Sequence, residues 1–236
     1  MNRHQIRIVV LLPMKGNSQR VKGKNFRDFC GKPLFRWILD TLSTVEEIDQ
    51  IIINTDARHI LAQNGLDETD RIVIRDRQPE LCGDLVNMNL ILADDVANVP
   101  ADIYLMTHTT NPLLSADTIR KALATFMEAH AAGEADSLFT VNKVQTRFYR
   151  ADCSPVNHDP DNLIPTQHLE PWFEENSNLY IFTRDSFART NARIGRQPMM
   201  YETPPFESID IDTPDDWDFA VVAARYFIER QKGGQL

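Results

Sequence analysis

The chain has 236 residues, of which 42% are hydrophobic and 25% charged, and its formal net charge is −9. This balance is typical of a single globular α/β domain covering residues 1–236. The negative charge excludes a broad nucleic-acid footprint or attraction to anionic lipid. Cys30, Cys82 and Cys153 leave one thiol unpaired in any disulfide scheme, so we expect reduced thiols in a cytoplasmic protein. The first apolar run, from Ile8 to Leu12, is too short for a signal peptide or a membrane span, which predicts a soluble protein.

Short runs of β-branched and apolar residues alternate with segments of helical period along most of the chain. We expect strands at 7–12, 51–53, 72–74, 103–106, 137–141 and 179–182, a buried strand at 199–201, and helices at 33–42, 85–96 and 116–130. Alternating strands and helices favour right-handed βαβ crossovers. The predicted fold is therefore α/β, with a doubly wound, mostly parallel sheet.

The alternation stops between Val144 and Glu175, where four prolines and several Asp and Asn residues replace the periodic apolar positions. A loop of this length inside a compact domain is usually functional or contacts a partner. We therefore treat residues 144–176 as an inserted segment. After it, Thr213 is predicted to cap a last helix beginning at Pro214, with Asp216 as the acid of a capping box.

Two carboxylates, Asp210 and Asp212, lie two residues apart in the alternating segment 208–212. If this segment is a strand, both side chains point to the same face, with Cα atoms roughly 7 Å apart. Mg²⁺ is normally held by one or two carboxylates while substrate phosphates and water complete its coordination. The pair therefore predicts a Mg²⁺ site. The alternative from these residues alone is a solvated strand face.

The segment after the first strand is basic and contains two glycines, Gly16 and Gly23. In open α/β sheets ligands bind beyond the carboxyl ends of the strands, and the loop after the first strand is a favoured place. The segment carries four cations within ten residues: Lys15, Arg20, Lys22 and Lys24. It matches neither the Walker loop nor the dinucleotide fingerprint. It is interpreted either as a phosphate-binding loop or as an ordinary basic surface loop.

Five motifs in chain order resemble the CMP-sialic acid synthetase (acylneuraminate cytidylyltransferase) family. They span most of the chain and comprise Lys24-Asn25, Gly31-Lys32-Pro33-Leu34, the stretch from Arg77 to Asp84, His108-Thr109-Thr110-Asn111-Pro112-Leu113, and Ser208-Ile209-Asp210-Ile211-Asp212. Each motif is weak alone, and the ordered set is fairly specific for sugar-acid cytidylyltransferases. The resemblance implies a Rossmann-like nucleotidyltransferase fold.

The resemblance also implies roles for particular residues. Nucleotide-binding residues would be Lys15, Gly16, Ser18, Arg20, Lys24 and Asn25 around the CTP phosphates, with Arg77 and Asn87 facing the base. Asp210 and Asp212 would hold Mg²⁺, and Lys24 would join them and His108 as catalytic residues. The acidic sugar would contact His108, Arg147 and Asn176. A homodimer is implied, in which the segment 144–176 crosses to the partner and helps to build the sugar-acid site.

Three departures from the family pattern concern charge. Lys15 stands where the family usually has arginine, and His108 replaces a sugar-contacting glutamine. Before the strand at 179–182, the family often shows Phe-Arg-Pro-Asn-Gly, whereas this chain has Phe173-Glu174-Glu175-Asn176-Ser177. An acid therefore stands where a cation would pair with the sugar's carboxylate. Lys143, Arg147 or Arg150 would be candidates for the missing charge.

The predicted reaction joins CTP to a 2-keto sugar acid, sialic acid or a related nonulosonate, and releases pyrophosphate. The alternatives are a nucleotidyltransferase acting on a different acid, such as 3-deoxy-octulosonate or a phosphonate, and a non-catalytic nucleotide-sugar sensor. His108 is a possible proton acceptor, since imidazole titrates near neutral pH. A structural, hydrogen-bonding histidine is the other interpretation.

Overall fold

The computed structural model describes residues 6–18 and 20–232, and within them the main element is a seven-stranded sheet. Its strand order is β5-β4-β1-β6-β8-β7-β9. In chain order the strands are β1 (Ile8–Leu11), β4 (Gln50–Thr55), β5 (Ile72–Asp76), β6 (Ile103–Thr107), β7 (Ser137–Val144), β8 (Trp172–Thr183) and β9 (Pro198–Glu202), and a separate small hairpin is formed by β2 (Asp28–Phe29) and β3 (Lys32–Pro33).

The sheet is mostly parallel, as predicted. Strands β5, β4, β1 and β6 pair in parallel, and β7 pairs in parallel with β9. Strand β8 is antiparallel to both of its neighbours, β6 and β7. One antiparallel strand therefore joins two parallel groups, and the carboxyl ends of the parallel strands lie along one edge of the sheet.

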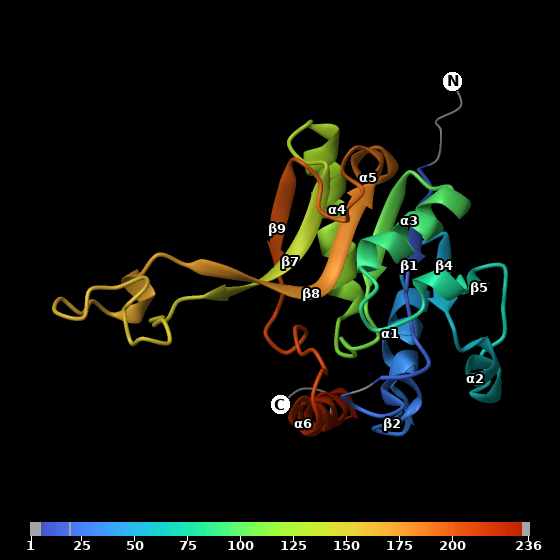
Figure 1. Ribbon diagram of the computed structural model, residues 1–236, viewed down its shortest axis with the longest axis horizontal. Helices are drawn as coiled ribbons and strands as arrows, with labels where there is room; N and C mark the ends of the chain where they lie inside the picture. The colour runs from blue at the N-terminus through green and yellow to red at the C-terminus, as the bar shows by residue number, and fades with distance from the viewer. Residues whose placement is uncertain (1–5, 19, 233–236) are drawn as a thin grey trace.

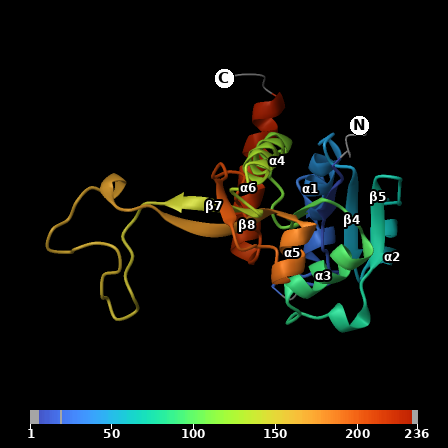
Figure 2. The same ribbon diagram turned by 90° about the horizontal axis from the view of Figure 1, so that it is seen from above.

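Helices cover both faces of the sheet (Figures 1 and 2). They are α1 (Leu34–Ser43), α2 (Arg58–Gln63), α3 (Met88–Asn98), α4 (Ala116–Ala131), α5 (Arg184–Thr190) and α6 (Pro214–Lys232), with short 3-10 turns at Lys24–Phe26, Pro79–Leu81 and Thr166–His168. Alternate side chains of β1 enter different cores. Val10 packs in the core with α1 and α4, whereas Val9 packs in the core with α3 and α5. This alternation is what a strand buried on both faces requires.

A third apolar cluster joins the C-terminal part of the chain to the segment after β1. Trp217 of α6 packs edge-on against Phe29 of the β2–β3 hairpin, with ring centroids 5.4 Å apart. Val21, Ile209 and Ile211 belong to the same buried cluster. Apolar packing therefore brings residues 209–212 beside the loop that follows β1, although nearly 190 residues separate them.

Three expectations about local structure need correction. Helix α3 begins at Met88 and not at Leu85, because Asn87 caps it by accepting the N–H of Asn89 and Leu85 is fully exposed. Residues 208–212 form no strand. The strand at 199–201 exists, but it belongs to the edge strand β9, whose pattern is largely exposed and where Met200 is 49% exposed.

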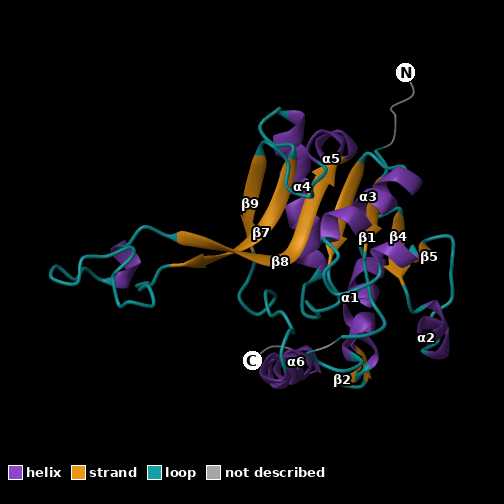
Figure 3. Ribbon diagram, viewed as in Figure 1, coloured by secondary structure: helices purple, strands orange, loops and turns teal. Residues whose placement is uncertain are grey.

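The inserted segment is an arm that projects away from the body of the molecule (Figures 1 and 3). It is less irregular than the sequence indicated, because β7 and β8 continue into it and pair from Val141 with Glu175 to Val144 with Trp172. The pairing register shifts by three residues between Phe139 and Val141, so β8 contains a bulge at residues 176–179. A search of the described residues finds no helix long and apolar enough to cross a membrane.

Candidate active site

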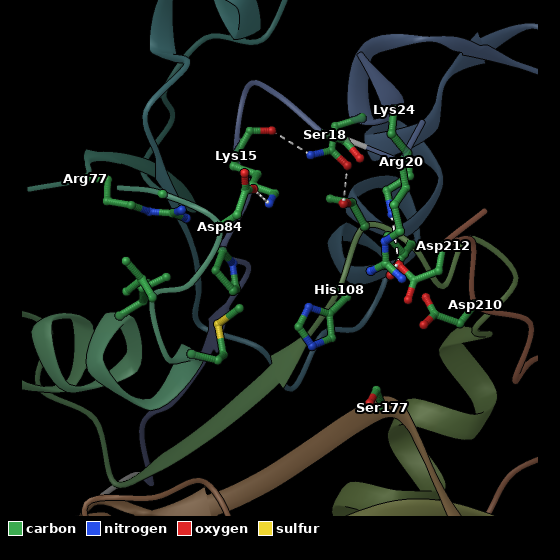
Figure 4. Close-up of a pocket in the computed structure, with 18 residues that line it drawn as sticks. Lys15, Ser18, Arg20, Lys24, Arg77, Asp84, His108, Ser177, Asp210 and Asp212 are labelled. Carbon is green, nitrogen blue, oxygen red and sulfur yellow. Dashed lines mark hydrogen bonds and ion pairs between the residues drawn. The ribbon is translucent and has the colours of Figure 1, made fainter. Parts of the chain in front are cut away.

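A cavity of about 540 Å³ lies beyond the carboxyl ends of the parallel strands (Figure 4). Its size is within the range of small-molecule sites. Segments that are distant in sequence line it: Pro13, Lys15, Ser18, Arg20, Lys24, Asn25, Arg77, Gly83, Asp84, Val86, Met88, Ile91, His108, Thr109, Thr110, Ser177, Asp210 and Asp212. The loop after β1 and the late acidic segment therefore meet across one cavity, as the sequence predicted.

Direct contacts hold Ile211 and Asp212 against the loop that follows β1. The buried Lys24 ammonium donates to the carbonyl oxygen of Ile211 (2.6 Å) and lies 3.3 Å from Asp212 Oδ1. Arg20 Nη2 lies 3.0 Å from the same Asp212 oxygen. Ile211 N–H donates to the carbonyl oxygen of Thr110, in the loop after β6 (3.0 Å). These bonds fix the segment without a strand.

The start of α6 fixes the backbone of Asp212. Asp216 Oδ2 accepts the N–H groups of Asp212 (3.1 Å) and Thr213 (2.7 Å), and the Thr213 hydroxyl oxygen accepts the N–H of Asp216 (3.2 Å). This is the reciprocal bonding of the predicted capping box. The contact with the Thr213 side chain holds the pKa of Asp216 below its usual value. Asp216 therefore supports the site from the helix end.

Asp210 lies in this cavity in surroundings that disfavour its charged form. Burial raises its pKa, and the nearby Asp212 carboxylate also raises it, while the Thr110 side chain lowers it. Asp210 Oδ1 is buried without a hydrogen-bond partner among the described residues. An orphaned carboxylate oxygen beside a second carboxylate fits a hard cation. The described residues contain no cluster of three or more His, Cys, Asp or Glu side chains suited to a metal, so phosphate or water ligands would have to complete the coordination.

On the opposite side of the cavity, Lys15 pairs with Asp84, whose Oδ1 lies 2.5 Å from the ammonium (Figure 4). Gly16 does not line the cavity. Its N–H donates to Asp56 Oδ1 (2.6 Å), and a Cβ there would lie 2.8 Å from that of Ala57. Gly16 is therefore needed because the loop packs closely against the start of α2.

Asn25 and Arg77 support the loop that follows β1 through hydrogen bonds. Asn25 Nδ2 donates to the carbonyl oxygen of Lys15 (2.8 Å), and its Oδ1 accepts from the Thr109 hydroxyl (2.7 Å). Arg77 is buried, and its guanidinium donates to the side-chain (2.9 Å) and main-chain (2.7 Å) oxygens of Asn54. Burial lowers the pKa of Arg77. Both residues therefore line the cavity, and their hydrogen bonds also fix the backbone around it.

His108 lies between the two sides of the cavity (Figure 4). Burial, together with the positive charge of Arg193, lowers its pKa to about 4. The imidazole is therefore neutral at pH 7 and a weak base. This disfavours the proton-acceptor interpretation and favours a hydrogen-bonding role.

Besides Gly16, three candidate residues of the described part of this chain lie outside the cavity lining. Asn87 caps α3. Asn176 uses its amide internally, donating to Thr203 Oγ1 (2.7 Å) and Asn142 Oδ1 (2.9 Å). Arg147 lies in the arm and donates to the carbonyl oxygen of Ile164 (2.6 Å). A direct role for Arg147 would thus require a partner subunit.

Sequence reasoning did not single out Asp84 or Ser177, although both line the cavity. Asp84 ends the motif that begins at Arg77. Ser177 has a φ of 57° in the β8 bulge, a conformation that favours glycine. It stands where the family motif has glycine, which was the available signal.

A sequence profile of the family described as cytidylyltransferase matches residues 9–224. The chain therefore belongs to the cytidylyltransferase family, and the resemblance noted in its motifs is confirmed. It is 26% identical to CMP-N,N'-diacetyllegionaminic acid synthase of Legionella pneumophila, over 90% of this chain and 94% of that one. It is 25% identical to N-acylneuraminate cytidylyltransferase B of Danio rerio, over 92% and 51%. Pseudaminic acid cytidylyltransferase of Campylobacter jejuni is 20% identical, over 90% and 94%.

Solved structures share the fold. The chain is similar to CMP:2-keto-3-deoxy-manno-octonic acid synthetase complexed with CTP, with a TM-score of 0.64 at 15% identity, over 94% of this chain and 99% of that one. It is also similar to a 4-diphosphocytidyl-2C-methyl-D-erythritol synthase from Anaerococcus prevotii, with a TM-score of 0.63 at 14% identity, over 94% of this chain and 99% of that one. The α/β nucleotidyltransferase fold is therefore confirmed.

Proposed function

We propose that this cytidylyltransferase transfers CMP from CTP to a 2-keto sugar acid of the nonulosonate class and releases pyrophosphate. The observation that carries the proposal is the convergence of Lys24 and Arg20 with Asp212 at one wall of the cavity. Sugar-acid names among the relatives support the acceptor class. The triphosphate would meet cations on both sides, since Lys15 lies on the other wall.

The chain's own residues act by positioning and by neutralising charge. The acceptor's anomeric hydroxyl gives up its proton to water and its oxygen forms a bond to the α-phosphorus of CTP. The bond from that phosphorus to the oxygen shared with the β-phosphate breaks, and pyrophosphate carries away the electron pair. Transfers of this kind need little covalent help from the protein. Lys15, Arg20 and Lys24 would stabilise the charge that develops on the leaving group. The hydrogen bonds of Asn25 with Lys15 and Thr109 would keep the loop after β1 in place.

Asp210 and Asp212 would hold Mg²⁺ in this proposal. Their carboxylates are of the hard oxygen type that Mg²⁺ prefers, and Asp210 has an unpartnered oxygen. When bound, the ion would act as a Lewis acid on the α-phosphate. Asp212 is already paired with Arg20 and Lys24. Nucleotide phosphates would compete for these two cations and so release the Asp212 carboxylate.

We also propose that the arm contacts a second copy of the chain. The arm carries six apolar side chains that are each at least 37% exposed: Tyr149, Val156, Leu163, Ile164, Trp172 and Phe173. A concentration of exposed apolar groups on one projection marks an interaction surface. Sedimentation should give a dimer mass for the intact chain. A monomer mass at micromolar concentration would contradict this assignment.

The test of function is pyrophosphate release from CTP, Mg²⁺ and a panel of acids: N-acetylneuraminate, N,N'-diacetyllegionaminate, pseudaminate and 3-deoxy-manno-octulosonate. We expect release with at least one nonulosonate and a dependence on Mg²⁺. Release with the octulosonate alone would place the acceptor in the other acid class. Tight CTP binding without release from any acid would indicate a nucleotide-sugar sensor. Thermal shifts with CTP, UTP, ATP and GTP would identify the preferred base.

A further inference from the structure

The loop between α5 and β9 carries an arginine, Arg193, with an unusual set of contacts. Its guanidinium carbon lies 3.8 Å from the centroid of the Tyr180 ring, so the cation stacks on an aromatic face. Its Nη2 lies 3.5 Å from Glu175 Oε1. Its Nη1 lies 3.8 Å from Met106 Sδ. A thioether is a weak acceptor, so this end of the guanidinium has capacity for a stronger one.

The loop is held firmly in this position. Asp136 accepts the N–H groups of Arg196 and Gln197, each at 3.0 Å. The N–H of Gly195 donates to Ser137 Oγ (2.8 Å). At the near end, the N–H of Arg193 donates to Asn89 Oδ1 at the start of α3 (3.3 Å). The Arg193 side chain is 21% exposed, so it is placed by the fold and remains accessible.

Arg193 is not itself among the residues that line the cavity, but its contacts link it to two that are. Tyr180, on which it stacks, donates a hydrogen bond to Glu175, and its hydroxyl lies 3.2 Å from Ser177 Oγ. Ser177 lines the cavity. The charge of Arg193 also acts on His108, another lining residue. Arg193 is therefore within electrostatic reach of a molecule bound beside His108 and Ser177.

Of the three cations expected from sequence to meet the acid, Lys143 is exposed on β7 and does not line the cavity, and the other two are engaged in the arm. Arg147 donates to the carbonyl oxygen of Ile164, and Arg150 is engaged with Ser154 and the carbonyl oxygen of Pro155, all within the arm. The phosphate-side cations Lys15, Arg20 and Lys24 are paired with carboxylates on the cavity walls. Near His108 and Ser177, the cation that the described residues provide is Arg193.

We propose that Arg193 recognises the carboxylate of the acceptor acid, in place of the cation absent from positions 174 and 175. This inference rests on the proposed sugar-acid cytidylyltransferase function. The guanidinium would keep one side on Glu175 and turn its Nη1 side to the substrate carboxylate, as its fork of five donors allows. Glu175 is a positioning residue, since the Tyr180 hydroxyl holds it and it in turn orients Arg193. The charge expected at position 174 is thus supplied from another loop.

The experiment compares an accepted acid with its methyl ester, using the full-length enzyme and CTP. In the wild type we expect kcat/KM for the ester to be lower by roughly 10- to 100-fold, because a charge-assisted hydrogen bond is lost. Arg193→Gln should raise KM for the acid by a similar factor and leave KM for CTP within about twofold. Acid and ester should then react about equally. Arg193→Lys should restore part of the preference, since it keeps the charge.

Arg196→Gln is the matched control. Arg196 lies in the same loop, its side chain is exposed, and the loop's bond to Asp136 comes from its backbone, so both kinetic constants should stay unchanged. The inference is overturned if the wild type uses acid and ester equally well, a result that needs no variant to fold. An Arg193→Gln enzyme that keeps its acid preference would overturn it too. If no acid supports pyrophosphate release in the wild type, the proposed function fails instead.

Discussion

Because Asp212 pairs with Arg20 and Lys24, removing its charge should raise the affinity for metal-free CTP and lower turnover with Mg²⁺. Asp212→Asn keeps the shape of the side chain and removes its charge. Without Mg²⁺, Arg20 and Lys24 are released from their carboxylate, so CTP should bind more tightly. The pair with Arg20 is 65% and 40% exposed, and such ion pairs contribute about 0.2–1 kcal/mol each. Two of them together, about 0.4–2 kcal/mol, correspond to a roughly 2- to 30-fold gain in affinity for metal-free CTP.

With Mg²⁺ present, the same variant should lose a metal ligand. Turnover is expected to fall by roughly 10²- to 10³-fold, the usual effect of removing one group that stabilises transition-state charge. Because the same two ion pairs are lost, stability should fall by no more than about 2 kcal/mol, which lowers Tm by at most roughly 4–8 °C in a chain of this size. The assays are CTP titration calorimetry with and without EDTA, pyrophosphate release and thermal unfolding. Full turnover, or an unchanged affinity in EDTA, would refute the reasoning.

Three further predictions concern other parts of the structure. Gly195→Ala would place a Cβ 2.1 Å from Asp136 Oδ1, so we expect a loss of about 1–3 kcal/mol in denaturant unfolding and a raised KM for the acid but not for CTP. His108→Gln should keep turnover within about tenfold and leave the pH profile unchanged between pH 6 and 8, because the pKa of His108 is lowered to about 4. If the wild-type rate declines below about pH 6.5 and the variant lacks this acidic limb, His108 is the base after all. Asp95 is fully buried, and burial raises its pKa to about 6, so the folded state holds its proton and loses about 3 kcal/mol as pH rises from 4 to 6. Asp95→Asn should lack this loss, and the difference in unfolding free energy between variant and wild type should therefore grow in the variant's favour over that range; parallel profiles would contradict the assignment.

The parallel sheet and its helices could be predicted because the relevant patterns are local. Fully apolar strands such as Ile51–Ile53 and N-caps such as Ser115 and Thr213 act within a few residues, and the structure has each where expected. The convergence of the loop after β1 with residues 208–212 followed from the roles that the family resemblance implies for both segments, and the cavity lining contains both.

The parts that could not be predicted depend on packing between distant segments. The segment 208–212 alternates like a strand, yet Ile209 and Ile211 are buried against α6 and not in a sheet. Asn176 looked like a ligand-binding amide, but the bulge in β8 turns it towards Thr203. Arg193 has no local signal, because its role depends on Tyr180 and Glu175 lying on a neighbouring strand.

Strand β8 runs without interruption from the arm, through the bulge, into the sheet beside β6. The part of the cavity lined by Ser177 therefore shares one stretch of backbone with the arm, whereas the part lined by Lys15, Arg20 and Lys24 belongs to a different loop. A substitution that alters the twist of the arm, or a subunit that binds it, can therefore shift the positions of Glu175 and Ser177 through the backbone of β8. If the proposed acceptor binds beside Ser177, a change in the arm can alter its recognition while the residues proposed to bind the nucleotide stay in place.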